Sequence, residues 1–148
     1  MLDFTAKEVN SQWKQDSQID KSNLDIEICK TPSLHSKYVD FYIDAKNHFN
    51  ELDDNYRKLG NVKRKYYKGE FTEAELKHWG WSQYQGIKPS NTELNSLLEY
   101  DKEMIKLKSE INVVKTIIEV CEMILKNITY RDTSIKTIYE YNRYINGG

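Results

Sequence analysis

The chain has 148 residues, 30% of them charged and 39% hydrophobic, and its 22 lysines and arginines nearly balance its 23 acidic residues. With only two prolines and six glycines, this composition favours a helical protein with a single core and extensive solvated surface over a compact sheet protein. No stretch approaches the length of a membrane span, and the N-terminal residues carry charges throughout instead of an apolar signal segment. We therefore expect a protein that is neither exported nor inserted into a membrane.

The cysteines and histidines show no metal-binding pattern. Cys29 and Cys121 are far apart and belong to no CxxC pair, and His35, His48 and His78 have no ligand spacing relative to them. We expect two reduced, partly buried thiols, as is usual in the cytosol, and neither a metal nor a cofactor.

The first part of the chain contains two short apolar patterns. Residues 3–15 predict a short helix, because apolar side chains recur at helical spacing at Phe4, Val9 and Trp13. Residues 24–28 have alternating apolar positions, which suit either a second short helix or a strand.

A long amphipathic helix is predicted over residues 33–68. Thr31 is a candidate N-cap, and Pro32 suits the first helical turn. From there on, apolar positions recur in alternating steps of three and four, which is the period of one helix face. Gly60 weakens this helix by about 1 kcal/mol relative to alanine without ending it, whereas Gly69 is a natural C-terminal stop.

The rest of the chain indicates a connector and two further helices. Within the connector, residues 69–91, Thr72 and Glu75 form the capping-box pattern of a short helix. A second long helix is predicted over residues 92–127, and a final helix over residues 132–146.

These elements predict an all-α fold of one domain, residues 1–148, in which two long helices form an elongated antiparallel pair flanked by short terminal helices. Each long helix has an apolar stripe wider than one partner helix can cover, and the helix over residues 132–146 is too short to be stable without docking. We therefore expect self-association through Ile117, Ile124, Ile135, Ile138, Tyr139 and Ile145. The alternative is that the helix over residues 132–146 docks within its own chain.

Residues 57–68 form the most concentrated basic segment of the chain, with no acidic residue and an adjacent pair of tyrosines. Cations neutralise phosphates and aromatic rings stack on unpaired bases, so this composition is typical of a surface for a flexible polyanion. A solvated helix face whose tyrosines belong to the core is the alternative interpretation. The candidate nucleic-acid contacts are Arg57, Lys58, Lys63, Arg64, Lys65, Tyr67 and Lys68.

The two adjacent tyrosines differ in their predicted roles. Neighbouring helix positions point about 100° apart, so Tyr66, which follows the apolar stripe, is expected in the core, and Tyr67 is expected to be free to stack on bases. The aromatic residues of the connector are either further stacking platforms or buried anchors. We expect Trp79 and Trp81 to be buried against the long helices.

The sequence contains no recognisable catalytic motif. It lacks the GxxxxGK[ST] loop that binds nucleotide phosphates, and it has neither GxSxG nor HExxH. Its acidic pairs are explained more simply as solvated helix faces. We therefore expect a protein without enzymatic activity.

Several segments, taken in order, resemble the UvsY recombination mediators of T-even-like bacteriophages. The stretches IDKSNLDIE and LHSKY resemble that family's ID-STKLQYE … LYSKW pattern, and the basic cluster with YYKGEF is similar to the family's basic run before Tyr-Tyr. The segment EYDKEMIKLKSEI and the C-terminal stretch beginning EVCEMILKNITYRDTS also match in order and spacing. The resemblance covers nearly the whole chain, and its specificity comes from several weak matches in the right order.

The resemblance implies a non-enzymatic mediator in the host cell cytoplasm. Such a mediator binds single-stranded DNA and loads a phage recombinase onto strands covered by a phage single-strand-binding protein, in homologous recombination, repair and recombination-dependent replication. The resemblance also implies a ring-like homo-oligomer of roughly six or seven subunits, with the helix over residues 132–146 as its oligomerisation element.

The chain departs from the family pattern at two places. The family's basic DNA-binding positions fall on Asn61 and Lys63, and only Lys63 keeps the charge. The connector is longer and richer in tryptophan than the family pattern, so no role is carried over to it. The alternative function is a helical scaffold or adaptor whose basic run contacts acidic protein partners.

Overall fold

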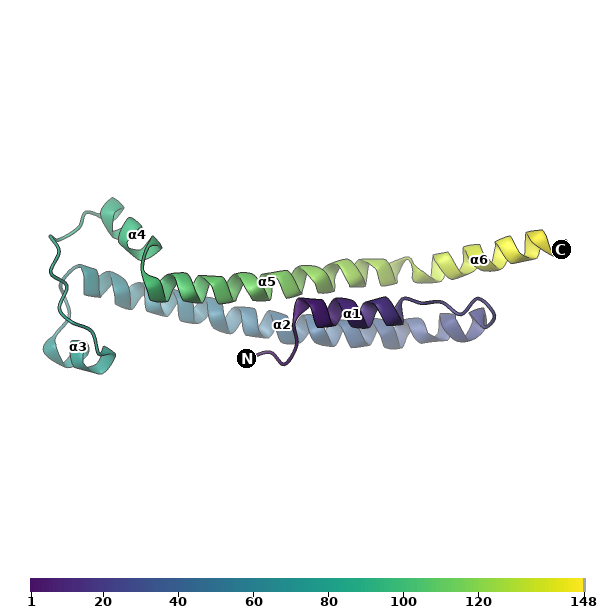
Figure 1. Cartoon of the computed structure of the whole chain (residues 1–148), viewed down its shortest axis with the longest axis horizontal. Helices are drawn as coiled ribbons and strands as arrows, with labels where there is room; N and C mark the ends of the chain where they lie inside the picture. Colours follow the sequence, from purple (N-terminus) through teal and green to yellow (C-terminus); the bar gives the residue numbers. More distant parts are fainter. Residues whose placement is uncertain (148) are drawn as a thin grey trace. The chain divides into compact units, whose positions relative to one another are not determined.

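The computed structural model describes residues 1–147, and all regular secondary structure in that range is helical, which confirms the all-α prediction (Figure 1). The helices are α1 (Ala6–Asp16), α2 (Leu24–Tyr67), α3 (Glu73–Trp79), α4 (Asn91–Glu99), α5 (Lys102–Thr129) and α6 (Arg131–Ile145). None of the helices in these residues is both long and apolar enough to span a membrane.

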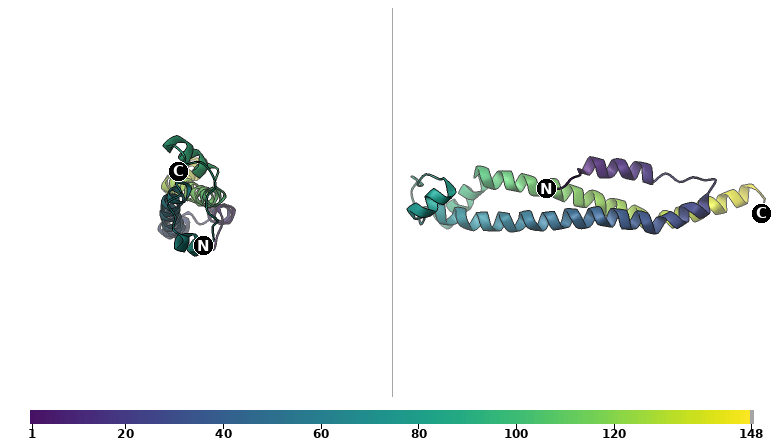
Figure 2. Two further views of the ribbon diagram at one scale, coloured as in Figure 1. Left: turned by 90° about the vertical axis from the view of Figure 1, so that its left-hand side faces the viewer. Right: turned by 90° about the horizontal axis from the view of Figure 1, so that it is seen from below.

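Backbone contacts divide the chain into two compact units. The first unit contains residues 1–48 and the C-terminal part from Val114 onward, and the second contains Phe49–Val113. Within each unit, the segments of α2 and α5 lie side by side and run in opposite directions (Figures 1 and 2). The prediction of a single domain stays a prediction, because α2 and α5 each contribute residues to both units.

In the first unit, α1 packs on α2 through aromatic side chains. Thr5 and Glu8 cap the start of α1 with reciprocal hydrogen bonds, and Val9 is fully buried. The ring of Trp13 meets that of Tyr38 with centroids 5.4 Å apart. A short helix is present as predicted, but it begins at Ala6 and not at residue 3, so Phe4 lies before it.

The first long helix begins at Leu24, not at residue 33 as predicted, so Pro32 lies inside it. Proline cannot donate the backbone hydrogen bond of its turn, and it normally favours a helix start. Here the turn before Pro32 is held from outside, because the Arg131 guanidinium donates to the backbone carbonyl of Glu27 and, at 2.7 Å, to the Thr31 hydroxyl. These contacts come from a residue far away in the sequence, which local reasoning does not reveal.

The core of the first unit contains half of the predicted oligomerisation residues. Ile117, Ile124 and Ile135 are each at most 3% exposed within one chain, so their expected role in subunit contacts is corrected to a role in the core. Ile138 is half-buried, whereas Tyr139 and Ile145 are 56% and 59% exposed. Only α6 thus keeps part of the predicted surface free.

In the second unit, α2 ends at Tyr67, close to the predicted stop. Gly69 adopts a φ of 73°, a left-handed conformation that glycine accepts without the steric cost of a side chain, and the N–H of Glu70 donates to the carbonyl of Lys65. Gly60 lies within α2, as predicted. Thr72 and Glu75 form the predicted capping box at the start of α3.

The second long helix, predicted as continuous over residues 92–127, is interrupted after α4. Ser90 caps α4, which ends before Tyr100. The carboxylate of Asp101 accepts the backbone N–H groups of Glu103 and Met104 at 3.0 and 3.1 Å, so it starts α5 as a new helix. A side-chain cap can replace helical hydrogen bonds, which is why aspartate favours helix starts over helix interiors.

Candidate nucleic-acid interface

The structure separates the predicted basic contacts into exposed and buried residues, all in the second unit. Arg57, Lys58, Arg64 and Lys65 are exposed, and Lys68 and Tyr67 are half-buried. Among residues 1–147, no ion pair involves Lys58, Arg64 or Lys68, whereas Arg57 pairs with Asp53 at 2.9 Å and Lys65 with Glu75 at 2.9 Å. Lys63 is only 5% exposed.

The Lys63 network joins the end of α2, the connector and the start of α5. The Lys63 ammonium lies 3.0 Å from the Asp101 carboxylate, 3.1 Å from Glu103, and 4.1 Å from the centre of the Trp81 ring. Tyr67 donates its hydroxyl to the same carboxylate of Asp101 at 2.7 Å. The prediction that Lys63 is a nucleic-acid contact is therefore revised: its charge is already neutralised inside the unit.

Hydrogen bonding sets the charge state of this network. Burial alone would raise the pKa of Asp101, but hydrogen bonds from Tyr67 and from the Met104 N–H, together with Lys63, hold that pKa below its ordinary value. Burial and the hydrogen bond to Asp101 raise the pKa of Tyr67. The carboxylate is thus ionised and the phenol neutral at neutral pH, which gives a stable donor–acceptor pair.

The surroundings of the two tyrosines differ from those predicted. Tyr67 is not free, since Asp101 holds its hydroxyl and its ring packs edge-on against Tyr84 with centroids 5.1 Å apart. Tyr66 is also half-buried, and it donates to the backbone carbonyl of Ser82 at 2.5 Å. Helix periodicity separates the two ring directions, but it cannot predict that the connector folds back over both.

The tryptophans of the connector are not equally buried. Trp81 is half-buried and packs on Tyr66 with centroids 5.1 Å apart. Trp79 is 40% exposed, and its ring lies nearly parallel to that of Trp81, with centroids 5.0 Å apart. The expectation of burial against the long helices therefore holds in part for Trp81 and fails for Trp79.

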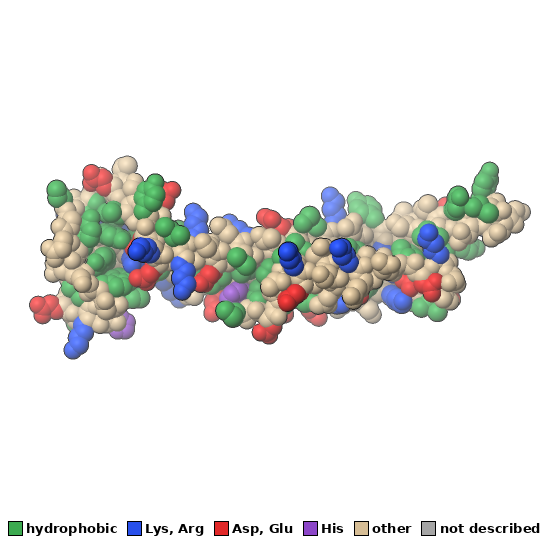
Figure 3. Space-filling model, viewed as in Figure 1, with side chains coloured by type: hydrophobic (Ala, Val, Ile, Leu, Met, Phe, Trp, Pro, Cys, Tyr) green, Lys and Arg blue, Asp and Glu red, His purple; other side chains and the backbone are tan. Residues whose placement is uncertain are grey.

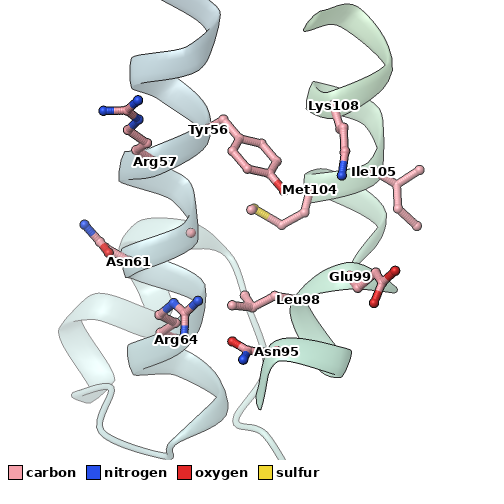
Figure 4. Close-up of a pocket in the computed structure, with 11 residues that line it drawn as sticks. Tyr56, Arg57, Asn61, Arg64, Asn95, Leu98, Glu99, Met104, Ile105 and Lys108 are labelled. Carbon is pink, nitrogen blue, oxygen red and sulfur yellow. The ribbon is translucent and has the colours of Figure 1, made fainter. Parts of the chain in front are cut away.

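A groove of about 390 Å³ lies between α2, α4 and the start of α5, and we refer to it as the basic groove (Figure 4). Arg57 and Arg64 line it from α2, with the Arg57 side chain directed away from α5 in Figure 4, and Lys108 lines it from α5. Glu99 is the single carboxylate among the lining residues. Figure 4 shows Tyr56 and Met104 pointing toward each other across it. Its other lining residues are Gly60, Asn61, Asn95, Leu98 and Ile105.

The chemistry of the basic groove suits a phosphate backbone. Guanidinium groups bind phosphate oxygens in a forked geometry, and lysine adds a point charge. Amide side chains from Asn61 and Asn95 offer neutral donors and acceptors beside these cations. Asn61 occupies one of the two positions where the family pattern has a basic residue. This position contributes to the lining of the groove, although it has lost its charge.

Sequence reasoning missed Lys108 and Asn95. A usable signal was present, because an antiparallel pair places the start of the second helix beside the end of the first. The segment EYDKEMIKLKSEI carries several lysines at that start, close to the basic end of α2. The position of α4 gave no such signal, since it depends on the break at Tyr100 and Asp101.

These features define an all-α protein with a basic groove suited to phosphates. A family model described as "Recombination, repair and ssDNA binding protein UvsY" matches residues 12–148. The chain belongs to the UvsY family, which confirms the resemblance found in its sequence. No curated protein sequence matches the chain.

Solved structures of a bacteriophage T4 protein share this fold. The crystal structure of the bacteriophage T4 recombination mediator protein UvsY in lattice type IV has a TM-score of 0.83 and 19% identity, over 95% of this chain and 99% of that chain. Its lattice type II form has a TM-score of 0.81 and 20% identity, over 95% and 97% of the two chains. At this level of identity, the likeness shows the fold.

Proposed function

We propose that the chain is a recombination mediator that binds single-stranded DNA through the basic groove. It acts without catalysis, loading a phage recombinase onto strands covered by a single-strand-binding protein, in recombination, repair and recombination-dependent replication. The observation that carries this proposal is that Arg57, Arg64 and Lys108 all contribute to the lining of one groove. Membership of a family described as recombination, repair and single-strand-binding supports it.

The groove makes a quantitative prediction for DNA binding. Replacing Arg57, Arg64 and Lys108 together with alanine should weaken binding to a single strand by on the order of 100-fold at 0.1 M salt, because each lost phosphate contact removes its share of counterion release. The salt dependence should also flatten by about two units in the slope of log K against log salt. Fluorescence anisotropy with labelled oligonucleotides at several salt concentrations measures both quantities.

A matched control removes the same charge from the first unit. Lys14, Lys21 and Lys126 are exposed there, and no ion pair involves them within the described residues. Their joint replacement with alanine should change affinity far less than the groove variant. Equal losses of DNA affinity in the two variants would assign binding to net charge. A groove variant with the affinity of the wild type would refute the proposal.

We further propose that the chain assembles into a ring-like homo-oligomer of roughly six or seven subunits through α6. Tyr139, Tyr144 and Ile145 are 56%, 84% and 59% exposed on α6. Figure 3 shows hydrophobic side chains gathered on this helix. Tyr139 also lines an apolar groove of about 470 Å³ with Leu24 and Ile28. Repeated basic grooves on one assembly raise the avidity for a long strand.

This assembly has a direct test. A Tyr139→Ser/Ile145→Ser double variant should sediment as smaller species while keeping its helix content, because both side chains are exposed within one chain. Ile87→Ser, which changes a 93% exposed side chain of the second unit, is the matched control and should leave the sedimentation coefficient unchanged. Sedimentation velocity of the double variant showing the wild-type species would contradict the role of α6.

A further inference from the structure

A second groove of the second unit has a different chemistry, and we refer to it as the tyrosine groove. Its volume is about 610 Å³, and its lining comprises Tyr67, Tyr84, Ile87, Pro89, Thr92, Glu93, Ser96, Leu97 and Tyr100. Figure 3 shows hydrophobic side chains gathered over this end of the second unit, around the connector and α4. The sole carboxylate, Glu93, already accepts the backbone N–H of Ser90 at 2.8 Å.

The back of the tyrosine groove is held in place. Asp101 accepts the Tyr67 hydroxyl at 2.7 Å, and Tyr84 packs edge-on against the Tyr67 ring. Tyr100, by contrast, is 78% exposed at the end of α4. Two rings of the groove are thus fixed by contacts, and the third is exposed to solvent. A flat ligand can bind beside fixed rings with little loss of side-chain conformational entropy.

The lining residues favour a neutral, planar ligand with polar edges. Aromatic rings provide stacking faces, and the hydroxyls of Thr92 and Ser96 provide donors and acceptors beside them. A phosphate group finds no cation among these lining residues. Unpaired nucleobases combine a flat π surface with hydrogen-bonding edges, and their stacking on tyrosine is tolerant of sequence.

Helix α4 connects this groove with the basic groove. One face of α4 supplies Asn95, Leu98 and Glu99 to the basic groove, and the opposite face supplies Ser96 and Leu97 to the tyrosine groove, which Tyr100 lines just beyond the end of α4. A single strand has both a charged backbone and neutral bases. The grooves on the two sides of this short helix match these two parts of a strand.

We infer that the tyrosine groove is a base-stacking subsite, which takes one or more unpaired bases of the strand whose phosphates bind in the basic groove. This inference rests on the proposed single-strand binding. It assigns affinity to two separable contributions, one from phosphates and one from bases.

Two probes separate the contributions: an oligothymidylate and an abasic strand of the same length, which keeps the phosphates and lacks the bases. The wild-type protein should prefer the oligothymidylate by at least about fivefold, the effect of stacking one base. Tyr100→Ala should abolish most of that preference while leaving the affinity for the abasic strand unchanged. Tyr100→Phe, which keeps the ring, should retain the preference.

The controls distinguish failure of the subsite from failure of the proposed function. Tyr130→Ala changes a 58% exposed tyrosine of the first unit and should keep the full base preference. The groove variant lacking Arg57, Arg64 and Lys108 should lose affinity for both probes alike, and if it loses neither, the proposed function fails. If Tyr100→Ala keeps the base preference, or if the wild type shows none, the subsite is refuted and the groove is left for a protein partner.

Discussion

Replacing Lys63 with methionine should lower the free energy of unfolding by about 3–5 kcal/mol, the usual cost of removing one partner from a buried ion pair. Asp101 would then be left 5% exposed without its cation, although the Tyr67 hydroxyl and two backbone N–H groups would still donate to it. The Trp81 ring would also lose the ammonium that lies 4.1 Å from its centre. Urea unfolding followed by circular dichroism measures the change.

Two further variants make this expectation specific. Lys58→Met removes an exposed lysine from the same helix and should alter stability by no more than about 0.5 kcal/mol. Adding Asp101→Asn to the Lys63 variant removes the unpaired charge and should restore part of the loss, although the amide is a weaker cap for α5. Wild-type stability of the Lys63 single variant would show that the network is not formed in solution.

A second large effect is expected at Arg131, which joins α6 to the start of α2 in the first unit. Its side chain is 4% exposed and pairs with the equally buried Glu27 at 2.6 Å, while it also donates to the Glu27 carbonyl and the Thr31 hydroxyl. Arg131→Met should cost about 3–5 kcal/mol in the free energy of unfolding, because these acceptors lose their donor and the exposed Lys30 is the cation that remains beside Glu27.

The forked geometry of the Arg131 guanidinium, and not its charge alone, is expected to contribute to the free energy of unfolding. Arg131→Lys keeps the charge but cannot reach the carboxylate and the turn before Pro32 together, so it should lose a large part of the same free energy. Lys136→Met removes an exposed cation from the same helix and should be nearly neutral. A lysine variant as stable as the wild type, measured by the same urea titration, would show that simple charge neutralisation suffices.

The regular parts of the fold were predictable because they depend on local patterns. Alternating steps of three and four placed most of α2, and the capping box at Thr72 and Glu75 placed α3. The errors arose where distant residues decide the outcome. The guanidinium of Arg131 supports a helix start before Pro32, and Asp101 starts a new helix inside what looks like one apolar stripe.

The candidate site was predictable in location but not in detail. A dense basic segment drew attention to the end of α2, beside which the basic groove lies, yet composition cannot show which cation is paired. Lys63 is buried in an ion pair with Asp101, whereas Arg57 and Arg64 line the basic groove together with Lys108 of α5. A helical wheel shows which side chains share a face of one helix. Whether that face is buried or exposed depends on which other element packs against it.

Helix α4 is a wall of both grooves, and only Tyr100 and Asp101 separate it from α5, with Asp101 fixed by its cap and ion pair. A strand that binds as we propose therefore contacts the same short helix through its phosphates and through its bases. A substitution that displaces α4 should then weaken both contributions together, unlike a substitution in one groove alone.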